Sequence, residues 1–317
     1  MKKYTWLGLS LLVIALIGMY GCAKVADVGT ALPNNVAWGT LSDGGGTALQ
    51  DGGTTSYRTM TISGTIEAPT IATALSTGTI VAATVEVNGN QISLNLTNLG
   101  TYYSFSGSIE LFRGTNTIII RNVDSQGTIY ASNPLTVTCT AAAVAIHIQL
   151  TWDKDGTDVD LHLIKPGGAF AKSPGTDASD CAFSNKTPDW DGDGVRNTVL
   201  GGPINDAQDP ALDIDDVNGY GPENTVIQTP ADGVFTVKAY YWSDHSYGST
   251  IPTVKVWINE SLIKTYVYNA ASLGEFVGTG SSHSLWTPCT ITVAGSSITL
   301  SDVGSIETAG VLSSMAK

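Results

Sequence analysis

The chain has 317 residues, of which 42% are hydrophobic and 14% are charged, and its 28 acidic against 15 basic side chains give a net charge of −13. A normal apolar fraction excludes a disordered polyanion, and the acidity argues against a nucleic-acid partner, because phosphate binding requires clustered Lys and Arg. At about 100 to 200 residues per domain, the length predicts two domains.

Residues 1–21 are typical of a secretory signal peptide. Lys2 and Lys3 precede an uncharged stretch that is too short to cross a hydrocarbon core of about 30 Å comfortably. The stretch ends at Gly21-Cys22, which resembles the lipobox of bacterial lipoproteins. The resemblance implies that Cys22 carries acyl chains such as palmitate and anchors the protein to a membrane, at the outer membrane or cell surface of the envelope. An ordinary cleaved signal with an incidental Cys22 is the alternative.

Residues 22–57 predict a flexible tether. They contain Gly44-Gly45-Gly46 and Gly52-Gly53 among many small residues, without a sustained period.

Residues 58–139 predict an immunoglobulin-like β-sandwich. Short runs of alternating apolar residues are separated by Gly, Asn and Thr, which is the strand pattern. Val87-Asn88-Gly89-Asn90 predicts a hairpin with a type I′ turn. The tracts Gly114-Thr115-Asn116-Thr117-Ile118 and Asn122-Val123-Asp124-Ser125-Gln126-Gly127 resemble bacterial immunoglobulin-like modules. This resemblance implies a spacer or an adhesion unit.

Residues 143–295 predict a second, larger β-sandwich of the jelly-roll or immunoglobulin-like kind, and residues 296–317 predict a loosely attached tail. Alternating segments such as Val159 to Ile164 and Val234 to Trp242 predict strands, and a long irregular segment lies between Lys165 and Thr229. The fold class is therefore all-β, with two sandwiches in tandem.

The negative charge is concentrated in the second domain. Between Thr151 and Glu223 there are 15 acidic and five basic residues, which give −10 of the −13. Ca²⁺ takes six to eight oxygen ligands from carboxylates, carbonyls and amides, so clustered aspartates predict a calcium region.

The first acidic cluster has the spacing of a calcium loop. Asp189-x-Asp191-x-Asp193-Gly194 matches the first half of an EF-hand, with Asn197 at position nine, but Leu200 replaces the bidentate Glu of position twelve. The loop looks like the aspartate-rich calcium loops of thrombospondin-type repeats, which recruit later ligands. The later candidates are Asp206, Asp209 and Asp213. A solvated acidic loop is the alternative.

Two further tracts carry acidic residues, one from Asp153 to His162 and one from Leu212 to Asn224. Along the strand from Asp158 to His162, alternation places Asp158, Asp160 and His162 on one face, where a cation would relieve the repulsion of the carboxylates. We expect His162 to be packed or hydrogen-bonded, and Asp155 to cap a turn whether or not it also binds metal. The complete set of predicted metal ligands is Asp153, Asp155, Asp158, Asp160, Asp189, Asp191, Asp193, Asp213, Asp215, Asp216 and Glu223.

The order of these tracts resembles a known family. Trp152 to His162, then Asn185 to Trp190, then Gly219-Tyr220-Gly221-Pro222-Glu223-Asn224 and Tyr240-Tyr241-Trp242 are similar to the YfaP-like bacterial envelope domains of unknown function. The resemblance covers about residues 144–295 and implies a sandwich that serves as an accessory module. The same part of the chain is also distantly similar to the pre-peptidase C-terminal β-sandwiches, some of which bind calcium.

The cysteines left after Cys22 are Cys139, Cys181 and Cys289. An oxidising compartment permits one disulfide among them, and the sequence does not choose the pair, although Cys181 with Cys289 is favoured because Cys139 lies where the domains join.

The chain carries no serine-hydrolase elbow, His-Glu-x-x-His, phosphate loop or dinucleotide motif, so we expect a protein that is not an enzyme. The first hypothesis is a structural or adhesion module that binds an envelope protein. The alternative is a carbohydrate-binding module, because sugars stack on exposed rings. The candidate rings are Tyr240, Tyr241, Trp242, Tyr247, Trp257, Tyr266 and Tyr268, which otherwise fill the core. A hydrolase is the third possibility.

Overall fold

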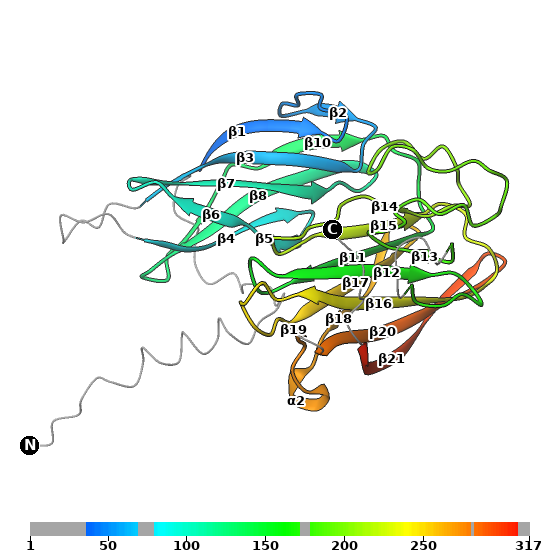
Figure 1. Ribbon diagram of the computed structural model, residues 1–317. Coiled ribbons are helices and arrows are strands. Elements are labelled where there is room, and N and C mark those ends of the chain that lie inside the picture. The colour runs from blue at the N-terminus through cyan, green and yellow to red at the C-terminus, as the bar shows by residue number, and fades with distance from the viewer. Residues whose placement is uncertain (1–35, 69–78, 172–177, 280–281, 310–317) are drawn as a thin grey trace, which may run out of the picture.

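The prediction of an all-β protein is confirmed. The computed structural model describes residues 36–68, 79–171, 178–279 and 282–309, which form four sheets in two sandwiches and one short helix (Figure 1). The helix, α2 (Ala270–Leu273), is a single turn. No helix within the described ranges has the length and apolar character that a membrane span requires. The predicted signal peptide, Cys22 and residues 22–35 of the predicted tether lie outside the described residues.

The first sandwich consists of a four-stranded sheet in the order β1-β3-β7-β6 and a six-stranded sheet in the order β2-β10-β8-β4-β5, with β9 beside β8. Its core is formed by apolar side chains that alternate along the strands, such as Met60, Ile62, Val85 and Ile118. The strands are β1 (Val36–Asp43), β2 (Gly53–Thr55), β3 (Thr59–Glu67), β4 (Ile80–Val87), β5 (Asn90–Ser93), β6 (Asn95–Asn98), β7 (Tyr102–Glu110), β8 (Gly114–Asp124), β9 (Ile129–Ala131) and β10 (Leu135–Cys139).

The predicted hairpin between β4 and β5 is confirmed. Val87 pairs with Asn90, and the two residues between them, Asn88 and Gly89, have φ values of 51° and 84°. These are the positive values that a type I′ turn requires at both central positions.

The prediction of a flexible tether is wrong for residues 36–55. Strand β1 pairs with β3, and β2 pairs with β10. The register of β1 shifts between Trp38 and Leu41, which interrupts the alternation that would reveal a strand. Few of its side chains are apolar and buried, so β1 is held mainly by backbone hydrogen bonds to β3, which leave no pattern in its own sequence.

The second sandwich consists of a five-stranded sheet in the order β14-β15-β11-β17-β18 and a six-stranded sheet in the order β13-β12-β16-β20-β19, with β21 beside β20. The strands are β11 (Ile146–Trp152), β12 (Asp158–Ile164), β13 (Asp180–Cys181), β14 (Ala211–Leu212), β15 (Glu223–Ile227), β16 (Gly233–Ser243), β17 (Pro252–Ile258), β18 (Ser261–Val267), β19 (Gly278–Thr279), β20 (Ser282–Ala294) and β21 (Ser297–Ala309).

The two faces of β12 are those that the alternation predicts. Val159, Leu161 and Leu163 belong to the core between the two sheets. Asp158, Asp160 and His162 therefore lie on the opposite face of the strand, and all three are buried.

The prediction of a loose tail is wrong for residues 297–309, which form the edge strand β21. It pairs with β20 from Ala294↔Ser297 to His283↔Ala309. Ile298, Leu300 and Ile306 pack against the core. Gly304, at φ 67°, and a register shift opposite Thr287 break the alternation of β21, so the sequence reads as a coil.

The predicted disulfide between Cys181 and Cys289 is wrong, since Cys139, Cys181 and Cys289 are all free and buried. Cys181 lies opposite Leu163, Leu163 opposite Val237, and Val237 opposite Cys289. The two thiols are thus three strand spacings apart, roughly 14 Å at about 4.8 Å per strand, whereas a disulfide requires Cα atoms within about 7 Å.

Candidate metal centre

The loop that carries Asp189, Asp191 and Asp193 is shaped by its own carboxylates. Asp189 accepts hydrogen bonds from the N–H groups of Gly192 (2.7 Å) and Gly194 (3.1 Å), and both glycines have positive φ. Asp193 accepts from the N–H of Val195 at 2.7 Å. These short-range turns hold the carboxylates together on one side of the loop.

Asn197 brings a later segment of the chain to this loop. Its side-chain amide donates to the carbonyls of Asp206 (3.0 Å) and Asp209 (2.8 Å), and its Oδ1 accepts from the N–H groups of Asn205 and Asp206. The residue at position nine of the calcium-loop spacing is therefore a buried clamp, with both ends of its amide bonded to backbone.

Five aspartates meet as a result, and we call Asp189, Asp191, Asp193, Asp206 and Asp209 the aspartate cluster. Asp189, Asp191 and Asp209 offer carboxylate oxygens within 4.8 Å of one another, and so do Asp191, Asp193 and Asp206. Of the three later candidates, Asp206 and Asp209 are brought to the loop, and Asp213 belongs to neither group.

Asp209 is the most deeply buried of the five aspartates. It is 1% exposed; its Oδ1 accepts from the N–H of Trp190 at 2.5 Å, and its Oδ2 has no hydrogen-bond partner. Burial, together with the carboxylates of Asp206, Asp191 and Asp189, raises the pKa of Asp209 above its ordinary value. Among the described residues, none of the five aspartates forms an ion pair. A divalent cation would satisfy the unpartnered oxygen and offset the repulsion.

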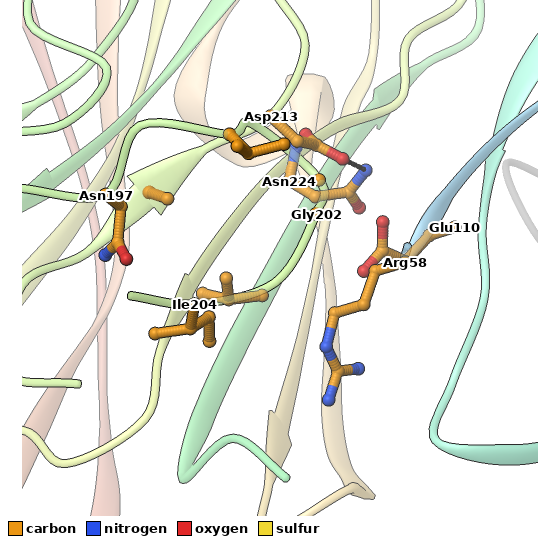
Figure 2. Close-up of a pocket in the computed structure, with 11 residues that line it drawn as sticks. Arg58, Glu110, Asn197, Gly202, Ile204, Asp213 and Asn224 are labelled. Atoms are coloured by element: carbon orange, nitrogen blue, oxygen red, sulfur yellow. Dashed lines mark hydrogen bonds between the residues drawn. The ribbon is translucent and has the colours of Figure 1, made fainter. Parts of the chain in front are cut away.

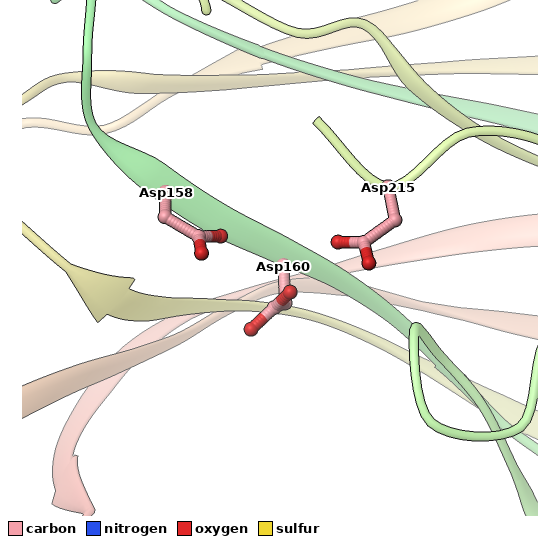
Figure 3. A group of neighbouring side chains, drawn as sticks. All are labelled: Asp158, Asp160 and Asp215. Carbon is pink, nitrogen blue, oxygen red and sulfur yellow. The ribbon is translucent and has the colours of Figure 1, made fainter. Parts of the chain in front are cut away.

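A second group joins β12 to the segment between β14 and β15. Asp158 and Asp160 on β12 lie within 4.8 Å of Asp215, counted between carboxylate oxygens (Figure 3). Lys186 approaches Asp215 at 3.8 Å. The two acidic tracts that the sequence placed in one domain thus meet in space, as a cation shared between them would require.

Two other predicted ligands, Asp153 and Asp216, accept hydrogen bonds that shape turns and join loops. Asp153 accepts from the Thr250 hydroxyl and the N–H of Ile251, and Asp216 accepts from the N–H groups of Asn218 and Gly221. Asp155 belongs to none of the three acidic groups found in the described chain.

Glu223 holds the backbone on both sides of the second acidic group through hydrogen bonds. Its Oε2 accepts from the N–H of Leu161 at 2.7 Å, and its Oε1 from the N–H of Asp216 at 3.2 Å. It ties β12 to the loop that carries Asp215, and it is fully buried.

The predicted behaviour of His162 is confirmed, and most of the rings are buried. His162 Nδ1 lies 2.9 Å from Asp180 Oδ2 in a buried pair. Of the seven candidate rings, five are buried: Tyr240, Tyr241, Trp257, Tyr266 and Tyr268. Tyr247 is 59% exposed and its ring lies over the backbone of Gly156.

Sequence reasoning did not find the junction between the two sandwiches. Arg58, immediately before β3, donates from Nη2 to Glu260 Oε1 (2.6 Å) and to the Ala142 carbonyl (2.8 Å). The ring of His147 on β11 stacks on Trp257 at 4.7 Å and lies 5.5 Å from that of Phe112, between centroids. No local signal marks these residues, because the partners come from distant parts of the chain.

Two acidic side chains lie in the same junction, of which Glu110 is buried and Asp213 is half-buried. Figure 2 shows Glu110 beside Arg58, with Asp213 bonded to Asn224. They line a cavity of about 10 Å³, near the lower limit for one water molecule. Burial and the nearby Asp213 carboxylate raise the pKa of Glu110 well above its ordinary value. Burial and the charge of Arg58 lower the pKa of His147 to about 3. His147 is therefore neutral near pH 7.

No family model matches the chain. An uncharacterised Listeria monocytogenes protein, lmo2446, is similar at 10% identity and a TM-score of 0.23, over 88% of this chain and 20% of that one. Another structure of that protein contains glucose, magnesium and calcium. The C-terminal domain of the Streptococcus pyogenes antigen I/II-family protein AspA is similar at 10% identity and a TM-score of 0.22, over 74% of this chain and 99% of that domain. TM-scores this low do not establish a common fold, and the chain spans about one fifth of the Listeria protein.

Proposed function

We propose that the chain is a lipid-anchored envelope protein in which calcium orders the loop-rich face of the second sandwich, and that this face binds a partner rather than catalysing a reaction. The observation that carries the proposal is the convergence of Asp206 and Asp209 on the Asp189–Asp193 loop, within 4.8 Å. The local sequence does not require this convergence, and five carboxylates brought together have no other compensation among the described ion pairs.

The chemistry of the cluster favours a hard cation. All five side chains offer oxygen, and exposed Asp191 and Asp193 leave room for water ligands. Ca²⁺ tolerates the irregular geometry of a loop better than Mg²⁺, which demands a near-ideal octahedron. The group of Asp158, Asp160 and Asp215 is a second candidate for the same ion.

The location rests on the N-terminal sequence. Lys2, Lys3 and the apolar stretch before Gly21-Cys22 support export and a membrane anchor at Cys22. The YfaP-like family is the proposed family, on the tracts from Trp152 to Trp242.

The calcium proposal is tested by calorimetric titration with CaCl₂ and by melting in CaCl₂ and in EDTA. At a hundredfold excess over Kd, ligand binding stabilises by about 2.7 kcal/mol, so we expect EDTA to lower the melting temperature by several degrees. Asp209→Asn should abolish this difference. Asp232→Asn, an exposed aspartate outside the cluster, is the matched control and should melt as the parent does, because Asn keeps the side-chain oxygen that accepts from the N–H of Gly295. If the titration shows no heat of binding and CaCl₂ does not raise the melting temperature, the protein does not bind calcium.

A carbohydrate partner is the second candidate, and Tyr247 is the observation that favours it. Its exposed ring lies beside the Asp153–Asp158 turn, held by a hydrogen bond from Lys154 Nζ to the Tyr247 carbonyl at 2.8 Å. A glycan array probed in CaCl₂ tests it, with Tyr247→Ala as the variant that should lose binding. An array without signal leaves an envelope protein as the proposed partner.

A further inference from the structure

Residues 197–205, which we call the tip loop, leave the aspartate cluster and return to it. Asn197 bonds to the backbone of residues 205, 206 and 209. Asn205 Oδ1 accepts from the N–H of Thr198 at 3.0 Å, and its Nδ2 donates to the Arg196 carbonyl at 2.5 Å. The two ends of the tip loop are thus fastened beside the cluster, with Asp193 before the loop and Asp206 after it.

The far end of the tip loop contacts the first sandwich. The Gly201 carbonyl accepts hydrogen bonds from the N–H groups of Arg58 (2.6 Å) and Thr59 (3.2 Å). Gly201 has a φ of 63°, and a Cβ at this position would overlap the side chain of Thr59. At Gly202 a Cβ would lie 2.8 Å from a ring carbon of Tyr57. Both the positive φ and the close approach therefore require glycine at position 201.

We infer that cation binding at the aspartate cluster fixes the position of the first sandwich against the second through the tip loop, an inference that rests on the proposed calcium site. Carboxylate oxygens of Asp193 and Asp206 lie within 4.8 Å of each other, together with one from Asp191. An ion between them joins the two ends of the tip loop. Without the ion, the carboxylates repel each other, and the ends are held by hydrogen bonds: those of the Asn197 and Asn205 amides, that from Gln208 Nε2 to Asp191 Oδ2, and that from the N–H of Trp190 to Asp209 Oδ1.

The second, independent indication of a ligand is Asp209. Its Oδ2 is a buried carboxylate oxygen without a hydrogen-bond partner. The backbone carbonyl of the same residue accepts a hydrogen bond from the side-chain amide of Asn197. The same clamp therefore connects the buried ligand to the base of the tip loop.

Loss of the ion should loosen this side of the junction and leave the rest in contact. The Arg58–Glu260 ion pair and the packing of the Phe112 ring of the first sandwich on Trp257 of the second, 5.2 Å between centroids, involve no residue of the aspartate cluster. The two sandwiches thus remain attached in both states. They move more freely against each other without the ion, and binding of the ion makes their arrangement rigid.

Hydrogen exchange of the full chain, in CaCl₂ and in EDTA, measures the contact between the tip loop and the first sandwich, because the backbone amides of Arg58 and Thr59 donate to the Gly201 carbonyl. We expect these two amides to exchange faster in EDTA by on the order of tenfold, while amides in the middle of β3, such as that of Ile62, stay unchanged. Asp206→Asn should exchange fast in both buffers. Asp232→Asn should behave as the parent does.

A second variant separates the inference from the proposed function. Gly201→Ala should bind calcium in a calorimetric titration as the parent does, but lose the protection of Arg58 and Thr59 in CaCl₂. If the parent binds calcium and the two amides exchange equally in both buffers, the coupling is refuted and the calcium site stands. If the titration shows no binding, both are refuted.

Discussion

The ion pair between Arg58 and Glu260 gives the sharpest test of how the two sandwiches are joined. The Arg58 side chain is 2% exposed and Glu260 is 22% exposed. Arg58→Met keeps an unbranched apolar side chain but is shorter and removes the charge, so Glu260 loses its ion-pair partner and the Ala142 carbonyl loses a donor.

The cost of this change follows from the burial of the two groups. Breaking a buried ion pair by removing one partner costs about 3 to 5 kcal/mol, because the remaining charge is left uncompensated. Glu260 reaches some water and keeps the hydrogen bond from the N–H of Val144 at 2.9 Å. We therefore expect a loss near the lower end of that range, about 3 kcal/mol in the free energy of unfolding.

Urea unfolding followed by tryptophan fluorescence measures this loss, and Trp257 reports from the junction itself. Lys264→Met is the matched control, because it removes a cation from an exposed pair in which Lys264 is 43% and Asp302 is 66% exposed. Exposed pairs contribute about 1 kcal/mol or less. If Arg58→Met costs no more than Lys264→Met, the junction does not depend on the buried ion pair.

Three further predictions concern the pH dependence, the edge strand and the thiols. Because the pKa of Glu110 is raised on folding, its contribution to stability is present at low pH and is lost as pH rises above the ordinary Glu pKa. Glu110→Gln should therefore melt higher than the parent at pH 8 and equally at pH 4; a difference independent of pH contradicts this. Truncation after Gly295 should lower the urea midpoint, since it removes β21 and the packing of its apolar side chains, whereas an unchanged midpoint would restore the interpretation as a loose tail. Burial raises the pKa of Cys289 to about 12 and that of Cys181 well above its ordinary value, so both thiols should react with a disulfide reagent only after denaturation; rapid reaction of the native protein would refute their burial.

Features that depend on neighbouring residues were predictable. The alternation along β12 fixes which side chains face the core, because successive side chains of a strand point to opposite faces. Asn88-Gly89 determines its turn through its own backbone preferences. Asp189, Asp191 and Asp193 shape their loop by bonding to N–H groups a few residues away.

Strand pairing at the edges was not predictable from the strands themselves. β1 and β21 are held by the backbones of β3 and β20, and each contains an irregularity that breaks the alternation of its own side chains. A hydrogen-bonded edge strand needs few buried side chains, so its sequence resembles that of a coil.

What the sequence determined is the class of fold, the acidic second domain and the first three aspartates of the cluster, all of which arise from contacts between near neighbours. Tertiary structure alone decided that Asp209 completes the cluster and that Asp213 instead accepts a hydrogen bond from Thr59 in the junction. It also decided that Arg58 meets Glu260, which is 202 residues away. The physical reason is that such contacts depend on how whole sheets pack, and packing sums many weak interactions that no single segment records.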